Sequence, residues 1–242
     1  MKHTEKELQL LKDEINEMWK IVISQLEKSK QSLLNGDIEL AREIISREKR
    51  VDAFELKIES DCENYIALYS PVAIDLRLVL SLMKISITLE RIADFAEGIA
   101  RHVIDNDCNK IDSQIMEELQ IENMFDILLS MISDCFAALE AENTHITGKI
   151  LTREEKIDTL YRDSLHILTN YMIKNENLGE EDNTSEKTFS ILNSPFSTQK
   201  VYCGLKLLLI IRKLERIGDH CSNIMEEIVF YVDAKVLKHN KN

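Results

Sequence analysis

The sequence predicts an all-α protein built from two tandem, structurally similar three-helix bundles. Apolar residues recur at spacings of three, four and seven along most of the 242-residue chain, which is typical of amphipathic helices. Only 6 Gly and 2 Pro are present, too few for the many tight turns of an all-β fold. Two segments of the first half recur in the second half in the same order, so we expect six long helices and an internal repeat.

The first two helices have clear start and stop signals. Thr4 followed by Glu7 is a capping-box pattern, and the apolar period that follows predicts one long helix. This helix should end at Asn35-Gly36, because glycine readily adopts the left-handed conformation that closes a helix. Asp37 is then well placed to cap the second helix.

A proline separates the second helix from the third. The second helix should run to Ser70, followed directly by Pro71. Proline suits the first position of a helix, so we expect Ser70 to be the N-cap of the third helix and Pro71 its first residue. The third helix should stop in the polar stretch 105–110.

The same pattern begins again after this stretch. We expect a fourth helix over about 112–139, a fifth over about 143–175 and a sixth over about 197–238. The segment 176–199 is polar and contains both a glycine and a proline, so it is predicted to be a long loop.

The internal repeat rests on two pairs of matching segments. Each pair aligns without a gap, and every segment contains the pattern Glu-x-x-x-Asp. The pairs are 44–52 with 150–158, and 89–94 with 214–219. We therefore assign 1–106 to a first three-helix repeat and 107–242 to a second.

The charge balance excludes several classes of partner. With 30 Lys+Arg against 43 Asp+Glu, the net charge of -13 repels nucleic acid and anionic lipid.

The N-terminus has no apolar signal core, and the longest apolar run, 207–211, is far shorter than the roughly 20 residues of a membrane span. We expect a cytoplasmic protein with no transmembrane segment and no nucleic-acid partner.

The candidate functional residues are four pairs of acids spaced one helical turn apart. Roughly seven acidic pairs at this spacing are expected by chance in so acidic a chain, so one pair alone is weak evidence. Four pairs at repeat-equivalent positions are stronger evidence. They are Glu48 and Asp52, Glu90 and Asp94, Glu154 and Asp158, and Glu215 and Asp219.

Helix geometry predicts that these pairs meet. Asp52 lies 18 residues before Ser70 and Glu90 lies 20 residues after it, so the two should be level on an antiparallel hairpin. Glu48 should then face Asp94, and the second half should repeat the arrangement. Four carboxylates at one level repel one another unless cations intervene, and oxygen ligands suit Mg, Mn, Fe or Zn. We therefore predict a metal site in each half.

The alternative is that neighbouring arginines neutralise the acids in surface ion networks, without any metal. The acids flank the apolar stripe, so the sites should be exposed. Glu97, Asn223 and Glu227 continue the same polar lines and are second-tier metal ligands, while His220 is either a supporting ligand or structural. The arginines concerned are Arg47, Arg50, Arg91, Arg153 and Arg216.

The sequence contains no phosphate-binding glycine loop and no arrangement that resembles a catalytic nucleophile. We therefore expect no catalytic residue and no enzymatic activity, and a binding and signalling adaptor is the leading hypothesis. Two alternatives stay open. One is a carboxylate-bridged metalloenzyme, and the other is a metal-free helical interaction protein.

Several segments resemble one known family. The segment 214–226, Leu-Glu-Arg-Ile-Gly-Asp-His-Cys-Ser-Asn-Ile-Met-Glu, closely resembles the helix motif of the PhoU family, and 71–77, Pro-Val-Ala-Ile-Asp-Leu-Arg, adds a second match. Asp75 in this second match joins the second-tier metal candidates. With 89–94, 47–52 and 153–158, the resemblance spans nearly the whole chain.

The resemblance implies more than the residues alone predict. It implies exposed multinuclear clusters of iron or zinc type and regulation of high-affinity phosphate uptake in a bacterium. Family members are adaptors beside a phosphate ABC transporter and a membrane sensor histidine kinase, repress phosphate-starvation signalling, and commonly form homodimers. We therefore expect a homodimer that these partners hold at the inner face of the membrane.

The chain also departs from the family pattern. Ala93 and Phe95 stand where the family motif favours Gly and His, and Lys200 replaces the second-half counterpart of Asp75. The acids of the first half are intact.

Overall fold

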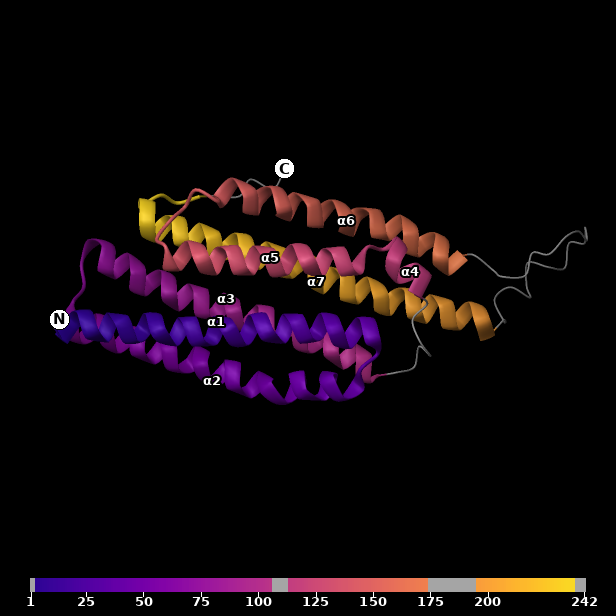
Figure 1. The fold of residues 1–242 in the computed structure, drawn as a ribbon, viewed down its shortest axis with the longest axis horizontal. Helices are drawn as coiled ribbons and strands as arrows, with labels where there is room; N and C mark the ends of the chain where they lie inside the picture. The colour runs from indigo at the N-terminus through magenta and orange to yellow at the C-terminus, as the bar shows by residue number, and fades with distance from the viewer. Residues whose placement is uncertain (1–2, 106–112, 174–194, 238–242) are drawn as a thin grey trace, which may run out of the picture.

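Helices make up most of the part of the chain that the structure describes (Figure 1). The computed structural model describes residues 3–105, 113–173 and 195–237, which form seven helices and no strand. Six of these helices are long, which confirms the predicted all-α class. Within these ranges, no helix combines the length and apolar character needed to cross a bilayer.

The first bundle follows the prediction closely at its first turn. Gly36 has a left-handed φ of 65° and ends the first helix. The Asp37 carboxylate accepts a hydrogen bond from the Leu40 amide at 2.9 Å and caps the second helix. The helices of this bundle are α1 (His3–Asn35), α2 (Ile38–Tyr69) and α3 (Ala73–Ile104).

The turn between α2 and α3 differs from the prediction. Ser70 is the C-cap of α2, with a φ of 48°, and its amide donates to the carbonyl of Ile66 at 3.1 Å. Val72 is the N-cap of α3 and makes no side-chain cap bond, so Pro71 lies outside both helices. A left-handed Ser70 closes the last turn of α2, and proline disfavours the right-handed helical conformation at the residue before it.

The second bundle contains a break that the sequence did not predict. The expected fourth helix, 112–139, is interrupted at Gln120, which has a left-handed φ of 52°. Leu119 and Ile121 are both buried, and two positions two residues apart do not share a helix face, so the break lets both enter the core. The helices are α4 (Ser113–Glu118), α5 (Ile121–Glu140), α6 (Thr147–Ile173) and α7 (Pro195–Asp233).

The turn before α6 explains why this helix starts later than expected. The Asn143 side-chain oxygen accepts a hydrogen bond from the His145 amide at 2.9 Å, and this local turn competes with helix formation. The predicted fifth helix, 143–175, therefore begins at Thr147. Its predicted last two residues lie outside the described residues.

The last helix is displaced toward the N-terminus relative to the prediction of 197–238. It begins at Pro195 and ends at Asp233, where Ala234 adopts a left-handed φ of 55°. The C-terminal part of the expected loop 176–199 is therefore helical, and the rest of that loop lies outside the described residues. The predicted boundary between the repeats, 106/107, also lies outside them.

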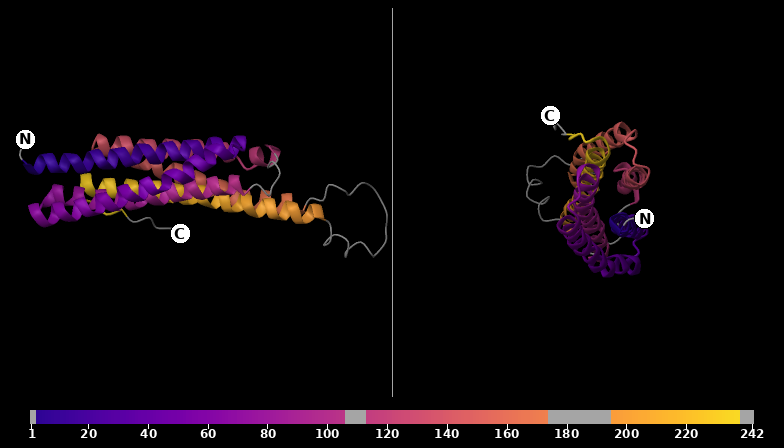
Figure 2. Two further views of the ribbon diagram at one scale, coloured as in Figure 1. Left: turned by 90° about the horizontal axis from the view of Figure 1, so that it is seen from below. Right: turned by 90° about the vertical axis from the view of Figure 1, so that its left-hand side faces the viewer.

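The two bundles share one continuous core. α3 packs against α7 and α1 against α5, with α2 and α6 on the outer sides (Figures 1 and 2). Trp19 of α1 is fully buried, donates from Nε1 to the carbonyl of Ile132 in α5 at 3.2 Å, and packs against Phe136. The repeats are therefore fused along their length through apolar packing.

Candidate functional site

The antiparallel pairing of α3 and α7 sets the level of the predicted acids. Ser81 Oγ of α3 donates to the carbonyl of Glu227 in α7 at 3.0 Å. Counted from this contact, Glu90 lies nine residues along α3 and Asp219 eight residues back along α7, so the acids of one repeat lie at about the level of those of the other. The level pairs are Glu90 with Asp219 and Asp94 with Glu215.

The four predicted acids of the first repeat lie together between α2 and α3. Glu48 is repelled by Asp52 and Asp94. Asp52 in turn repels Glu90 and Asp94. Glu90 and Asp94 are also close enough to share a hydrogen bond. The structure thus has the arrangement that the hairpin geometry predicts, and we call these four acids, with Glu55 and Glu97, the first acid cluster.

Ionisation of this cluster is costly without a cation. The pKa of Glu90 is raised to about 7, first by burial and then by the charges of Asp94 and Glu55. Burial is also the largest cause of the raised pKa of Glu48, followed by repulsion from Asp52. Asp94 is exposed to solvent, yet partial desolvation is the largest cause of its raised pKa. A bound cation would reverse such shifts, because it favours the charged form of each acid.

Glu55 belongs to the first acid cluster although the sequence argument missed it. It lies one turn beyond Asp52 on α2, and its pKa is raised by burial and then by Glu59 and Asp52. The repeat comparison could not reveal it, because the equivalent position of the second repeat is Tyr161. Its spacing of three from Asp52 was the available signal.

Glu97 is held differently from the other acids. It lies one turn beyond Asp94 on α3, is only 8% exposed, and forms an ion pair with Arg101. Its charge nevertheless contributes to the raised pKa of Glu48 and of Asp94. Of the second-tier candidates, Glu97 is therefore the one that joins a cluster.

The second acid cluster lies between α6 and α7. One oxygen from each of Asp158, Glu215 and Asp219 lies within 4.8 Å of the others. Glu154 is 4% exposed, and its Oε2 accepts a hydrogen bond from Ser222 at 2.9 Å. The expectation of an exposed site is therefore wrong for Glu154, which is buried, accepts a hydrogen bond from Ser222 and is not one of the three acids whose oxygens lie within 4.8 Å of one another. These four acids are the second acid cluster.

The remaining second-tier candidates are farther from the clusters. Asn223 is exposed, one turn beyond Asp219. Glu227, another turn on, accepts from Lys84 of α3 at 3.0 Å and serves the contact between bundles. Asp75 is exposed near the start of α3, about 22 Å along the helix from the first acid cluster. The structure does not bring Asp75 or Glu227 to either cluster.

Most of the neighbouring arginines do not neutralise the predicted ligands. Arg216 lies 3.5 Å from Asp219, its ion-pair partner in the second acid cluster. Three of the other arginines beside the predicted ligands form ion pairs with acids outside both clusters. They are Arg47 with Glu43 at 2.6 Å, Arg50 with Glu17 at 3.1 Å and Arg153 with Asp134 at 2.6 Å. This arrangement weakens the alternative in which arginines replace the metal.

His220 lies between the two clusters. Its ring stacks on Phe95 across the contact of α3 with α7, with ring centroids 5.6 Å apart. Burial, followed by the charges of Arg91 and Arg216, lowers the pKa of His220 to about 4, so the imidazole is neutral at neutral pH. Its Nδ1 is buried and has no hydrogen-bond partner among the described residues. These features favour the structural role for His220.

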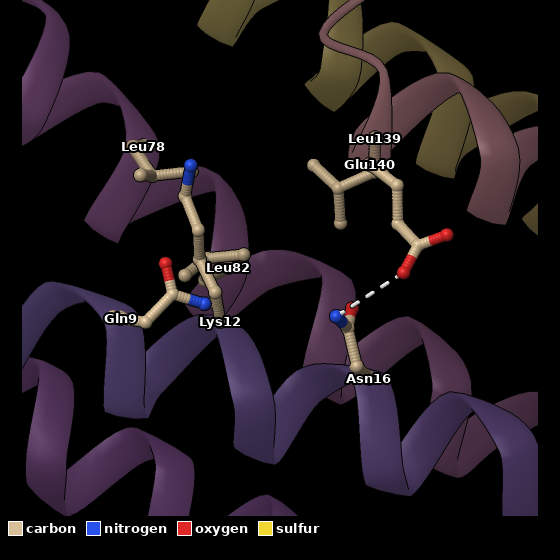
Figure 3. Close-up of a pocket in the computed structure, with 7 residues that line it drawn as sticks. All are labelled: Gln9, Lys12, Asn16, Leu78, Leu82, Leu139 and Glu140. Atoms are coloured by element: carbon tan, nitrogen blue, oxygen red, sulfur yellow. Dashed lines mark hydrogen bonds between the residues drawn. The ribbon is translucent and has the colours of Figure 1, made fainter.

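A separate pocket lies between α1, α3 and α5 (Figure 3). It encloses about 230 Å³ and is lined by three leucines and four polar residues. Asn16 Nδ2 of α1 donates to Glu140 Oε1 of α5 at 3.5 Å. The lining residues are Gln9, Lys12, Asn16, Leu78, Leu82, Leu139 and Glu140. None of them belongs to an acid cluster.

Known proteins match nearly the whole chain. The PhoU domain matches residues 15–103 and again 121–228. The phosphate-specific transport system accessory protein PhoU homolog 1 of Thermotoga maritima is 28% identical over 236 residues, covering 98% of this chain and 91% of that protein. The accessory protein PhoU of Escherichia coli is 28% identical over 234 residues, covering 96% and 86%.

Two solved structures share the fold. The crystal structure of PhoU from Pseudomonas aeruginosa superposes with a TM-score of 0.77 at 22% identity, covering 96% of this chain and 99% of that one. The phosphate transport system regulatory protein PhoU from Streptococcus pneumoniae gives a TM-score of 0.76 at 24% identity, covering 98% and 100%. The two domain matches coincide with the two helical repeats.

Proposed function

This chain belongs to the PhoU family, and on that premise we propose that it is an accessory protein that regulates phosphate uptake and phosphate-starvation signalling. Its relatives are named accessory proteins of phosphate-specific transport, and one solved relative is named a regulatory protein. None of these names describes an enzyme. The match over both repeats is the observation that carries the proposal.

The proposal includes metal ions bound at both acid clusters. In the second cluster, three carboxylate oxygens within 4.8 Å of one another suit a cation that takes several oxygen ligands. In the first cluster, burial and then the charges of Asp94 and Glu55 raise the pKa of Glu90 to about 7, and a bound cation would favour its charged form. Iron or zinc is the expected metal from the family resemblance. A bound ion would supply positive charge and join α2 to α3, and α6 to α7.

The partners follow from the same premise. A phosphate ABC transporter is the first, and a membrane sensor histidine kinase is the second. We propose that the chain acts as a homodimeric adaptor between them, at the inner face of the membrane. The net charge of -13 favours attachment through proteins over attachment through anionic lipid.

The test uses a bacterial strain that lacks the gene and carries a reporter for phosphate-starvation transcription. In abundant phosphate, we expect the reporter to be active without the protein and repressed when the protein is supplied. The transporter should co-purify with the protein from detergent-solubilised membranes. An unchanged reporter and unchanged phosphate uptake after deletion would contradict the regulatory role.

A matched variant separates regulation from metal binding. Glu90→Gln combined with Asp219→Asn removes one negative charge from each cluster while retaining side-chain shape. This variant should accumulate normally and fail to repress the reporter. Full repression by the variant would contradict the metal part of the proposal and leave the regulatory part intact.

A further inference from the structure

Lys213 of the second repeat lies in a notch that Gly98 of the first repeat provides. A Cβ atom at Gly98 would lie 2.7 Å from Lys213 Nζ and 3.0 Å from its Cε. Such a close contact would displace the end of the lysine side chain. Lys213 Nζ also lies 5.9 Å from the centroid of the Phe95 ring, within range of a cation–π interaction. The lysine is therefore positioned by α3, although it belongs to α7.

The charge of Lys213 acts on the first acid cluster. Gly98, whose notch holds the ammonium, lies one helical turn beyond Asp94 on α3. The ammonium opposes the burial and the neighbouring acids that raise the pKa of Asp94. Within the described parts of the chain, no carboxylate oxygen lies within 4.0 Å of this ammonium. The charge of Lys213 is therefore not neutralised by one ion pair, and it acts electrostatically on the neighbouring first acid cluster.

The second acid cluster has no equivalent lysine. The repeat counterpart of Lys213 is Thr88, whose hydroxyl donates to the carbonyl of Lys84 at 2.8 Å. The second cluster instead has Arg216, which pairs with Asp219 on its own helix. Lys213 therefore introduces a difference between the repeats, on the side where six acids gather.

We propose that Lys213 is an internal counter-cation of the first acid cluster, supplied across the contact between the two repeats. A fixed cation beside clustered carboxylates lowers the free energy of the metal-free site and repels an incoming metal ion. Lys213 therefore stabilises the metal-free protein and weakens metal binding at the first cluster. This inference rests on the proposed metal binding. Lys213 makes the first cluster release metal more readily than its acids alone would allow.

The first test measures metal affinity by calorimetric titration with Mn²⁺. Asp158→Asn and Asp219→Asn are present in every protein, so that only the first cluster is titrated. Lys213→Met should raise the affinity by roughly three- to tenfold, because it removes one positive charge near the site. Lys213→Arg should leave it nearly unchanged. An unchanged or weaker affinity in Lys213→Met would overturn the inference.

Two further variants separate position from charge. Gly98→Ala fills the notch and displaces the ammonium of Lys213. Like Lys213→Met, it should therefore raise the Mn²⁺ affinity, although the lysine is still present. Lys206→Met is the matched control, because Lys206 is a second lysine of α7 whose ammonium donates to the carbonyl of Asp105, the C-cap of α3, at 2.6 Å. It should leave the affinity unchanged. An equal gain in Lys206→Met would assign the effect to net charge alone and contradict a specific role for Lys213.

The second test needs no metal. Urea unfolding in the presence of a chelator gives the coupling between Lys213→Met and Asp94→Asn. We expect Lys213→Met to lower the unfolding midpoint, and to lower it less when Asp94 is already neutral. Coupling indistinguishable from zero would overturn the role of Lys213. Absence of Mn²⁺ binding in every variant would instead overturn the proposed metal binding at the first cluster, so the two failures are distinguishable.

Discussion

Phe95 of the first repeat stacks on His220 of the second, with ring centroids 5.6 Å apart and ring planes inclined by 23°. Each residue directly follows the aspartate of its repeat, Asp94 or Asp219, so the two occupy equivalent positions. The stack therefore lies where the two repeats meet around an approximate two-fold axis. The acid clusters flank this axis at one level, which makes the contact of α3 with α7 the structural link between them.

The stack of Phe95 on His220 predicts the effect of replacing His220 by phenylalanine, the residue at the equivalent position of the first repeat. His220→Phe keeps a ring against Phe95 and removes a buried nitrogen that has no hydrogen-bond partner among the described residues. We expect stability to stay the same or rise by up to about 1 kcal/mol, whereas His220→Ala should cost about 2 kcal/mol. Urea unfolding measures both. Metal content should be unchanged in His220→Phe, and its loss would show that His220 is a ligand.

Repulsion in the first acid cluster predicts a variant that gains stability. The pKa of Glu90 is raised to about 7 in the folded protein. Its ionisation therefore lowers the stability of the fold as the pH rises from the usual pKa of Glu through about 7. Glu90→Gln should therefore stabilise the chelator-treated protein at neutral pH, by about 1 kcal/mol after allowance for solvent screening. It should also reduce metal binding. A less stable metal-free variant would contradict the claim that ionised Glu90 is destabilised by burial and by repulsion from the neighbouring acids.

The hydrogen bond between Ser222 and Glu154 predicts a cost in the second cluster. Ser222 Oγ donates to the buried Glu154 Oε2 at 2.9 Å. Ser222→Ala leaves a buried carboxylate without this donor, so we expect a loss of about 1–3 kcal/mol in chelator-treated protein. Bound metal should recover part of that loss. Thermal unfolding with and without metal measures the difference, and an equal loss in both states would show that Glu154 does not bind the ion.

A polar network between the bundles predicts a dependence on acid pH. The Tyr231 hydroxyl donates to Glu142 Oε1 at 2.7 Å, and Lys12 Nζ lies 3.0 Å from the same oxygen. These two contacts lower the pKa of Glu142. Because the folded pKa is lowered, this stability is present above the usual pKa of Glu and is lost as the pH falls through the lowered value.

Tyr231→Phe tests this network. It should cost about 1 kcal/mol at neutral pH, and the difference from the unmodified protein should shrink at about pH 4 and below. Urea unfolding across this range measures the dependence. A cost that does not change with pH would assign the role of Tyr231 to packing alone.

Much of the candidate site could be predicted because helix geometry is regular. The level of Asp52 with Glu90 follows from the rise per residue and one turn at Pro71, even though the cap residues of that turn were wrongly assigned. The break at Gln120 could not be predicted from the apolar period, because a left-handed glutamine has no strong sequence signal. The break is needed only because Leu119 and Ile121 are both buried in the core, which the folded structure shows.

The contacts between the two repeats could not be predicted from the sequence for a different reason. The apolar period shows which face of a helix is buried, but it does not show which helix covers that face. The fit of Lys213 against Gly98, and the stack of Phe95 on His220, depend on the register of α3 against α7. That register is set by packing along the whole core.

We propose that both acid clusters bind metal ions. The most direct measurement is metal content, by mass spectrometry, of untagged protein purified without chelators. The comparison is a variant with Asp52→Asn, Asp94→Asn, Asp158→Asn and Asp219→Asn, shown by circular dichroism to be folded. We predict stoichiometric transition metal in the unmodified protein and its loss in the variant. Equally negligible metal in both proteins would contradict metal binding and leave the clusters as acidic surfaces for protein contact.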